Sequence, residues 1–191
     1  MKALFALPFL VAAGCATPTA VPPPTFFANL SALCGKAFEG RIVSPPVEAD
    51  ASFAGKRLVM HVRECSADTI RIPFHVGDDH SRTWVISRTT AGYRLKHDHR
   101  HADGSEDTVT QYGGDTIAPG TAVRQEFPAD AFTKALLLRE GNAAGVANVW
   151  AIEVEPERIF AYELRRPGRF FRVEFDLTHP VGPPPPPWGS R

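Results

Sequence analysis

The sequence predicts an all-β protein, a single antiparallel up-and-down barrel of about ten strands with one or two short helices, and a β-sandwich is the alternative. Three observations predict this class. Short stretches rich in β-branched and aromatic residues recur along most of the chain. Only two stretches have helical start and stop signals. Turn residues separate the apolar stretches at Ala91-Gly92, Asp103-Gly104, Pro119-Gly120 and Pro167-Gly168.

The individual elements follow from this alternation of apolar stretches and turns. A helix over Phe26–Leu33 precedes the first strand, and a second over Asp130–Glu140 begins after Pro128 and ends at Gly141. The ten expected strands are Phe38–Val43, Lys56–Glu64, Thr69–Val76, Arg82–Arg88, Tyr93–His101, Asp107–Gly113, Thr121–Phe127, Val146–Glu155, Arg158–Arg166 and Phe170–Leu177.

Composition limits the partners. The chain has 191 residues, with 21 basic and 21 acidic side chains. This balance provides no basic face, so we expect no nucleic-acid partner. Residues 26–181 are long enough for one domain with a single core, which is the expected β-barrel domain.

Residues 1–15 have the layout of a secretory signal peptide, with an early lysine, a short apolar run and small residues before Cys15. The run is too short to cross a bilayer as a helix. A cysteine after small residues resembles the lipobox of bacterial lipoproteins, with Ala12 where that motif favours leucine. The resemblance implies that Cys15 is acylated. Ordinary cleavage after Ala16 is the alternative.

The same resemblance implies a location. A lipoprotein with Ala16 after the modified cysteine is expected on the periplasmic side of the bacterial cell envelope, anchored in the outer membrane. A secreted or soluble periplasmic form is the alternative. Residues 16–25 are a Pro-rich tether, and residues 182–191 are expected to be a disordered Pro-rich tail. Such a tail could also bind an aromatic groove of a partner.

The cysteines predict one crosslink. Cys15 is acylated or lost with the signal, which leaves Cys34 and Cys65 as a pair in an oxidising compartment. Two buried free thiols are one alternative. A two-cysteine metal site is another, but no C-x-x-C spacing supports it. We therefore expect a disulfide between Cys34 and Cys65.

A short helix, a stretch of small, glycine and aromatic residues, and many meandering strands together resemble the calycin superfamily of lipocalin-like barrels. The residues that carry the resemblance are Leu33, Gly35, Phe38, Glu39 and Gly40, with Phe38 where such barrels often have Trp. The resemblance implies a barrel with a ligand site at its mouth. Some calycin-like barrels hold haem through one inward histidine.

The hairpin from Tyr93 to Tyr112 carries the candidate site. Because strand side chains alternate between faces, one face of its first strand is uniformly charged and must be outward. The opposite face carries Tyr93, Leu95, His97, His99 and His101. A two-residue turn at Asp103-Gly104 would place four more polar residues on that inward face, namely Glu106, Thr108, Thr110 and Tyr112.

Three interpretations of this face compete. His97, His99 and His101 with Glu106 have the ligand types for Zn or Cu, although alternate strand residues are about 7 Å apart. The second interpretation is a pocket for a polar ligand, lined by these residues with Tyr93, Thr108, Thr110 and Tyr112. The third is that the histidines simply satisfy one another and water in a hydrated interior.

The hairpin from Arg158 to Leu177 has a clear register. Pairing Arg165 with Phe170 places Glu163 opposite Arg172 on the outer face and leaves an apolar inner wall. Four arginines cluster near the turn, where either an anion site or a solvated hairpin end is expected; they are Arg165, Arg166, Arg169 and Arg172.

The leading functional hypothesis is non-enzymatic binding of a small polar or amphipathic ligand in the barrel mouth. The first alternative is a metal- or haem-dependent protein that uses His97, His99 or His101. The second is a structural or interaction protein of the envelope whose proline tail contacts a partner. The sequence contains no Gly-x-Ser-x-Gly, HExxH, P-loop or dinucleotide fingerprint, and no catalytic residue is assigned.

Overall fold

The structure is a computed structural model that describes residues 25–190. The expected signal peptide, Cys15 and almost all of the expected tether lie outside the described residues. A path of ten hydrogen-bonded antiparallel strands forms a nearly closed barrel, which confirms the predicted fold class. In the described part of the chain, no helix is long and apolar enough to cross a membrane.

Most helices and strands lie close to the predicted ranges, and the strand predicted over Asp107–Gly113 is the main exception. Both predicted helices are present. The elements in chain order are α1 (Phe26–Ser31), β1 (Ala37–Ile42), the 3₁₀ helix η1 (Glu48–Phe53), β2 (Leu58–His61), β3 (Glu64–Cys65), β4 (Thr69–Val76), β5 (Asp79–Arg88), β6 (Tyr93–His99), β7 (Tyr112–Asp115), β8 (Arg124–Pro128), α2 (Ala131–Arg139), the 3₁₀ helix η2 (Ala143–Ala147), β9 (Val149–Glu155), β10 (Ile159–Arg166) and β11 (Arg169–Val181).

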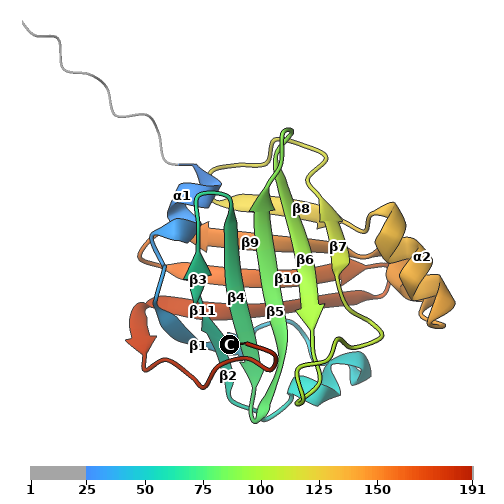
Figure 1. Ribbon diagram of the computed structural model, residues 1–191, viewed down its shortest axis with the longest axis horizontal. Coiled ribbons are helices and arrows are strands. Elements are labelled where there is room, and N and C mark those ends of the chain that lie inside the picture. Colours follow the sequence, from blue (N-terminus) through green and yellow to red (C-terminus); the bar gives the residue numbers. More distant parts are fainter. Residues whose placement is uncertain (1–24, 191) are drawn as a thin grey trace, which may run out of the picture.

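The topology is that of an up-and-down barrel. The strand order is β7-β6-β5-β4-β2-β1-β11-β10-β9-β8, and the short β3 pairs with β4 beside this path. Two meanders, one from β1 to β7 and one from β8 to β11, are joined where β1 pairs with β11. Figure 1 shows the strands β4 to β7 crossing in front of β8 to β11, so that the core lies between the two layers.

Contacts at the start of α2 hold the two edge strands, β7 and β8, together. The backbone N–H of Asp130 donates to the carbonyl of Gly113 at 3.0 Å. The hydroxyl of Thr133 accepts from the Gly113 N–H at 2.7 Å and donates to its carbonyl at 2.8 Å. A Cβ on Gly114 would lie 1.8 Å from the carbonyl oxygen of Pro128, so only glycine allows this approach.

One end of the barrel is covered by α1. Thr25 caps this helix by accepting from the Ala28 N–H, and the rings of Phe26 and Phe27 are fully buried. The predicted disulfide between Cys34 and Cys65 is present, with the two Cα atoms 6.4 Å apart. It connects the chain after α1 to β3, and closing a loop of this length stabilises the fold by about 3–4 kcal/mol.

The hairpin of β10 and β11 has the predicted register. Arg165 pairs with Phe170 and Glu163 pairs with Arg172. Both strands alternate regularly up to the turn after Arg166. For this reason the register could be derived from sequence.

The predicted register of the hairpin that begins at Tyr93 is wrong. Its loop has three residues, 102–104, rather than two, and Gly104 takes the left-handed φ of +87° that closes such a loop. The one-residue shift places Glu106 opposite Arg100 instead of His101. Glu106 is therefore on the charged outer side of the hairpin.

A second irregularity follows in the stretch predicted as a strand over Asp107–Gly113. The chain is irregular there until β7 begins at Tyr112, and Tyr112 rather than Thr110 pairs with His97. These extra residues act as a large bulge, which breaks the two-residue alternation on which the prediction depended. Thr108 is consequently exposed.

The C-terminal segment differs from the expected disordered tail. Residues 182–190 return across the outer face of the barrel, and Figure 1 shows them crossing in front of β4 and β5. The Trp188 N–H donates to the carbonyl of His80 at 3.0 Å, and the two rings stack with centroids 6.3 Å apart. Gly189 lies against the backbone of Gly104, in the three-residue loop of the hairpin that begins with β6.

Candidate functional site

A cavity of about 190 Å³ lies inside the barrel, between the two crossing layers. β4, β5, β6 and β7 line one side, β9, β10 and β11 line the other, and η1, α2 and the residues around η2 contribute at the rim. Of the eight residues predicted as ligand contacts, three line this cavity: His97, His99 and Tyr112.

Three of the other predicted contacts have different neighbours. Tyr93 lies at the α1 end, with its ring 5.3 Å from that of Phe26. Thr110 is buried, and its hydroxyl accepts from the backbone N–H of His99 at 2.8 Å. Thr108 is exposed in the irregular stretch before β7. The structure therefore does not place them around the cavity.

The four candidate metal ligands are not brought together. His101 is exposed beyond the end of β6, and Glu106 accepts from Arg100 at 3.2 Å on the outer side. Only His97 and His99 remain in the interior. Among residues 25–190, no group of three or more His, Cys, Asp or Glu side chains is arranged to hold a metal ion.

His97 has a hydrogen bond at each ring nitrogen. Nδ1 lies 3.1 Å from the carbonyl of Tyr112, and Nε2 lies 2.8 Å from the hydroxyl of Tyr162. Since a carbonyl only accepts, Nδ1 carries the proton and Nε2 accepts from the phenol. Burial and the neighbouring His99 lower the pKa of His97 to about 3, so it is neutral at physiological pH.

His99 forms a second imidazole–phenol pair. Its Nε2 lies 3.2 Å from the hydroxyl of Tyr112, whose ring stacks on that of His97 at 4.4 Å. Burial and the nearby Arg82 lower the pKa of His99 to about 4, and burial raises the pKa of Tyr112 to about 12. Both members of this pair are therefore neutral at pH 7.

Aromatic rings form the wall of the cavity. Trp84 stacks on Tyr162 with ring centroids 4.4 Å apart, and it stacks on Phe74 at 4.7 Å. Trp150 lies 5.2 Å from the ring of His97 on the opposite layer. Stacked and tilted aromatic faces such as these provide apolar surface for a flat ligand.

Arginines lie at the rim. Arg82 pairs with Asp79, and Arg169 pairs with the buried carboxylate of Asp50. The Nε of Arg169 is buried without a hydrogen-bond partner in the described part of the chain. The sequence predicted a cluster of arginines, Arg169 among them, near the turn between β10 and β11, and an anion site was one of the two interpretations of that cluster.

Arg166 is the third arginine of the rim. Its guanidinium donates to the side-chain carbonyl of Asn148 at 3.2 Å, and no carboxylate pairs with it among the described residues. Burial and the positive charge of Arg169 lower its pKa from the ordinary value, the nearby carboxylate of Asp50 acts in the opposite direction, and the guanidinium remains charged. In the described part of the chain Arg166 thus differs from Arg82 and Arg169 in having no directly paired carboxylate.

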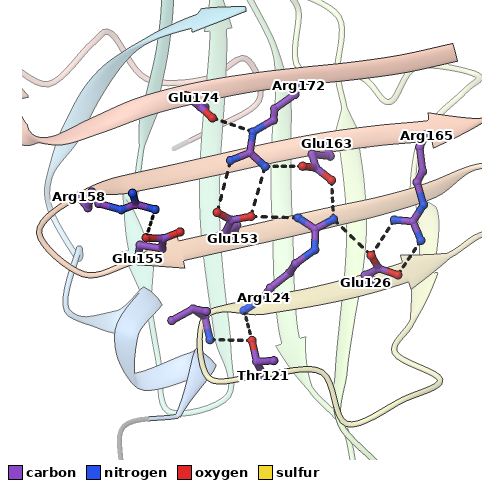
Figure 2. Close-up of polar contacts among 11 residues, drawn as sticks. Thr121, Arg124, Glu126, Glu153, Glu155, Arg158, Glu163, Arg165, Arg172 and Glu174 are labelled. Carbon is purple, nitrogen blue, oxygen red and sulfur yellow. Dashed lines mark hydrogen bonds and ion pairs between the residues drawn. The ribbon is translucent and has the colours of Figure 1, made fainter. Parts of the chain in front are cut away.

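The other two arginines of the predicted cluster, Arg165 and Arg172, lie on the outer face. Figure 2 shows a network in which Arg172 and Arg124 flank Glu163 and also contact Glu153. Burial alone would raise the pKa of Glu163, but hydrogen bonds from the two arginines lower it below its ordinary value. These charges neutralise one another, so this wall is structural.

The interior does not fit a haem. The cavity of about 190 Å³ is below the roughly 300–1,000 Å³ of pockets for drug-sized ligands, and a haem is larger than such ligands. Tyr162 also occupies the Nε2 lone pair of His97, which would have to ligate the iron. The residues present therefore do not fit a haem held by His97.

Sequence reasoning missed the aromatic part of the site and the contribution of Arg82. Tyr162 was assigned to the apolar inner wall of its hairpin, and Trp84 and Trp150 were not singled out. Local alternation could not show that β9 and β10 face β6 across the barrel. The chain matches no protein-family model, no curated protein and no solved structure.

Proposed function

We propose that this protein is a non-enzymatic binding protein that holds one small amphipathic ligand in the mouth of its barrel. The observation that carries the proposal is the composition of the cavity. Aromatic rings provide an apolar wall, and two neutral imidazole–phenol pairs and the rim arginines provide a few polar groups. Binding sites for small molecules have this combination of mostly apolar surface and few convergent polar groups.

The architecture agrees with this proposal. A nearly closed up-and-down barrel that leaves an interior cavity has the form expected from the resemblance to calycins, which use the barrel mouth for ligands. The volume limits the ligand, because about 190 Å³ equals the space of roughly six water molecules. A single substituted ring fits this space better than a lipid or a macrocycle.

Tryptophan fluorescence tests the proposal directly. Trp84 and Trp150 line the cavity, and Trp188 lies outside the barrel, so a Trp188→Phe background removes the reporter that does not contact the cavity. Benzoate, benzamide and benzyl alcohol serve as probes. We expect at least one of them to change the fluorescence with saturation.

A matched pair of variants controls this experiment. Val109→Phe adds a ring to the cavity, whereas Val85→Phe adds the same ring on the outer face of β5. We expect the first variant to abolish probe binding and the second to preserve it. If no probe binds, or if both variants bind equally well, the proposed function is wrong.

The proposal includes a location in the cell envelope, with an acylated Cys15 that anchors the protein to the outer membrane. The lipobox-like sequence supports it, and the disulfide is consistent with an oxidising compartment. Mass spectrometry of the mature N-terminus tests it. An acylated cysteine is the expected result, and an unmodified chain that begins at Ala16 or later would refute lipidation.

A further inference from the structure

We infer that the ligand is a small aromatic monoanion whose carboxylate binds Arg166 at the rim and whose ring lies against the aromatic wall. This inference rests on the proposed function and specifies the chemical class of the ligand. Three independent features of the cavity carry it: the sign of its charges, the unpaired state of one arginine, and the shape of its apolar wall.

The charges that line the cavity are all positive. Arg82, Arg166 and Arg169 contribute to the lining, and no Asp or Glu side chain does so among residues 25–190. The two lining histidines add no charge because they are neutral at pH 7. A cavity with low-dielectric walls and cations of one sign attracts an anion.

The partners of the three arginines select one of them as the anion site. The charges of Arg82 and Arg169 are already compensated by Asp79 and Asp50. Arg166 donates only to a neutral amide in the described structure. A guanidinium that lacks a carboxylate and lines a cavity is suited to bind a carboxylate through two parallel hydrogen bonds.

A second unused donor lies in the same wall. The Nε of Arg169 is buried and has no hydrogen-bond partner in the described part of the chain. A buried donor without a partner is uncommon, because its desolvation is not repaid. An anion held by Arg166 would lie near the adjacent guanidinium of Arg169, whose charge lowers the pKa of Arg166, and within reach of the Asp50 carboxylate, whose charge raises it.

The remainder of the ligand faces aromatic rings. Phe74, Trp84 and Tyr162 form a continuous stack that runs from β4 and β5 across to β10, and Trp150 lies on the adjacent strand β9. A planar ring can stack on such a surface, and the volume of about 190 Å³ allows little beyond one ring and its substituent. The site thus fits an aromatic carboxylate better than an inorganic anion.

Benzoate and benzamide provide the test, because the two molecules have nearly the same shape and differ in charge. We expect the protein to bind benzoate at least about tenfold more tightly than benzamide, and the preference to weaken in high salt. The measurement is the fluorescence titration in the Trp188→Phe background, repeated by calorimetry on the unmodified chain.

Neighbouring arginines on one strand provide the matched variants. Arg166→Gln removes the charge at the cavity, whereas Arg165→Gln removes the same charge from the outer face, where Arg165 pairs with Glu126. We expect Arg166→Gln to weaken benzoate about tenfold and to leave benzamide unchanged. Arg165→Gln should change neither affinity.

The outcomes distinguish this inference from the proposed function. Equal affinity for both probes, or no effect of Arg166→Gln on benzoate, would overturn the anion class while the binding function stands. Failure of benzoate, benzamide and benzyl alcohol to bind would overturn both. A loss of both probes in Arg165→Gln would show that the effect is structural and would also count against the inference.

Discussion

Two buried histidines in different regions of the barrel differ most clearly in their hydrogen bonds. His97 points into the interior and His75 lies on the outer face of β4, and they are 2% and 3% exposed. Burial is the largest cause that lowers both pKa values, to about 3 and about 4. His97 has a partner at each ring nitrogen, whereas neither nitrogen of His75 has one in the described structure.

This difference shows that burial of a polar side chain does not by itself identify a site. The bonds of His97 fix its tautomer and orient the phenol of Tyr162 at the cavity. His75 packs edge-on against His80 at 4.6 Å, and Trp188 of the C-terminal segment covers His80. Its burial costs free energy that no hydrogen bond offsets.

Acid pH should produce the largest change in the free energy of unfolding, because it acts on the histidines of both regions together. The folded pKa values of His75, His97 and His99 lie below the ordinary value of 6.5, so the unfolded chain binds protons first. The free energy of unfolding therefore falls as pH falls through 6.5 toward 4. Between pH 7 and 5 we expect a loss of about 2 kcal/mol for each of these histidines.

Urea unfolding at pH 7, 6 and 5 measures this loss. This window lies above the ordinary pKa values of the carboxyl groups, so the histidines dominate it. A free energy of unfolding that stays constant from pH 7 to pH 5 would mean that these imidazoles are accessible to protons in the folded barrel. The distinction between the two regions would then lose its basis.

Removal of one partner should make His97 resemble His75. Tyr162→Phe deletes the hydroxyl that donates to Nε2 and leaves a buried acceptor without a partner. We expect a loss of about 1–3 kcal/mol in unfolding free energy at pH 7. Tyr112→Phe is the matched variant and should cost less, because the bond to His99 is longer, at 3.2 Å, and less buried. Chemical denaturation of both variants compares them, and equal losses would contradict the expectation.

The sequence predicted the regular parts of this molecule because alternation persists there. The hairpin of β10 and β11 has an apolar inner face and charged outer face without interruption, so its register followed from pairing Glu163 with Arg172. The second helix followed from Pro128 before it and Gly141 after it, and the disulfide followed from Cys34 and Cys65 as the remaining pair.

The site could be predicted only in part. His97 and His99 were found because the charged face of β6 had to be outward. Glu106 and Thr108 were misplaced because a three-residue loop and a bulge each changed the parity of the alternation, and no residue type fixes such insertions in advance. Contacts across the barrel, such as that of Tyr162 with His97, depend on strand packing that local patterns do not contain.

Uncovering His75 on the outer face should lower the free energy of unfolding less than removing a hydrogen bond in the interior. Trp188→Ala removes the ring that stacks on His80 and loosens the C-terminal segment. We expect a loss of about 1 kcal/mol and a rise of the pKa of His75 toward 6.5, because solvent reaches it. Titration of the histidine signals by NMR measures both. An unchanged pKa of His75 would show that the segment does not cause its burial.

The smallest change in unfolding free energy is expected when the outer imidazole, that of His75, is removed. His75→Leu replaces a buried ring whose two nitrogens have no partners with an apolar side chain of similar size. Because no hydrogen bond is lost and no group is orphaned, we expect a change within about 1 kcal/mol at pH 7, with stabilisation as the favoured sign. The variant should also lose the part of the acid sensitivity that His75 contributes.

His97→Leu is the counterpart, and it should destabilise the protein because it orphans the hydroxyl of Tyr162 and the carbonyl of Tyr112. If His75→Leu costs as much as His97→Leu in the same denaturation experiment, then the outer imidazole has a partner after all, and the two regions do not differ in the way that the structure indicates.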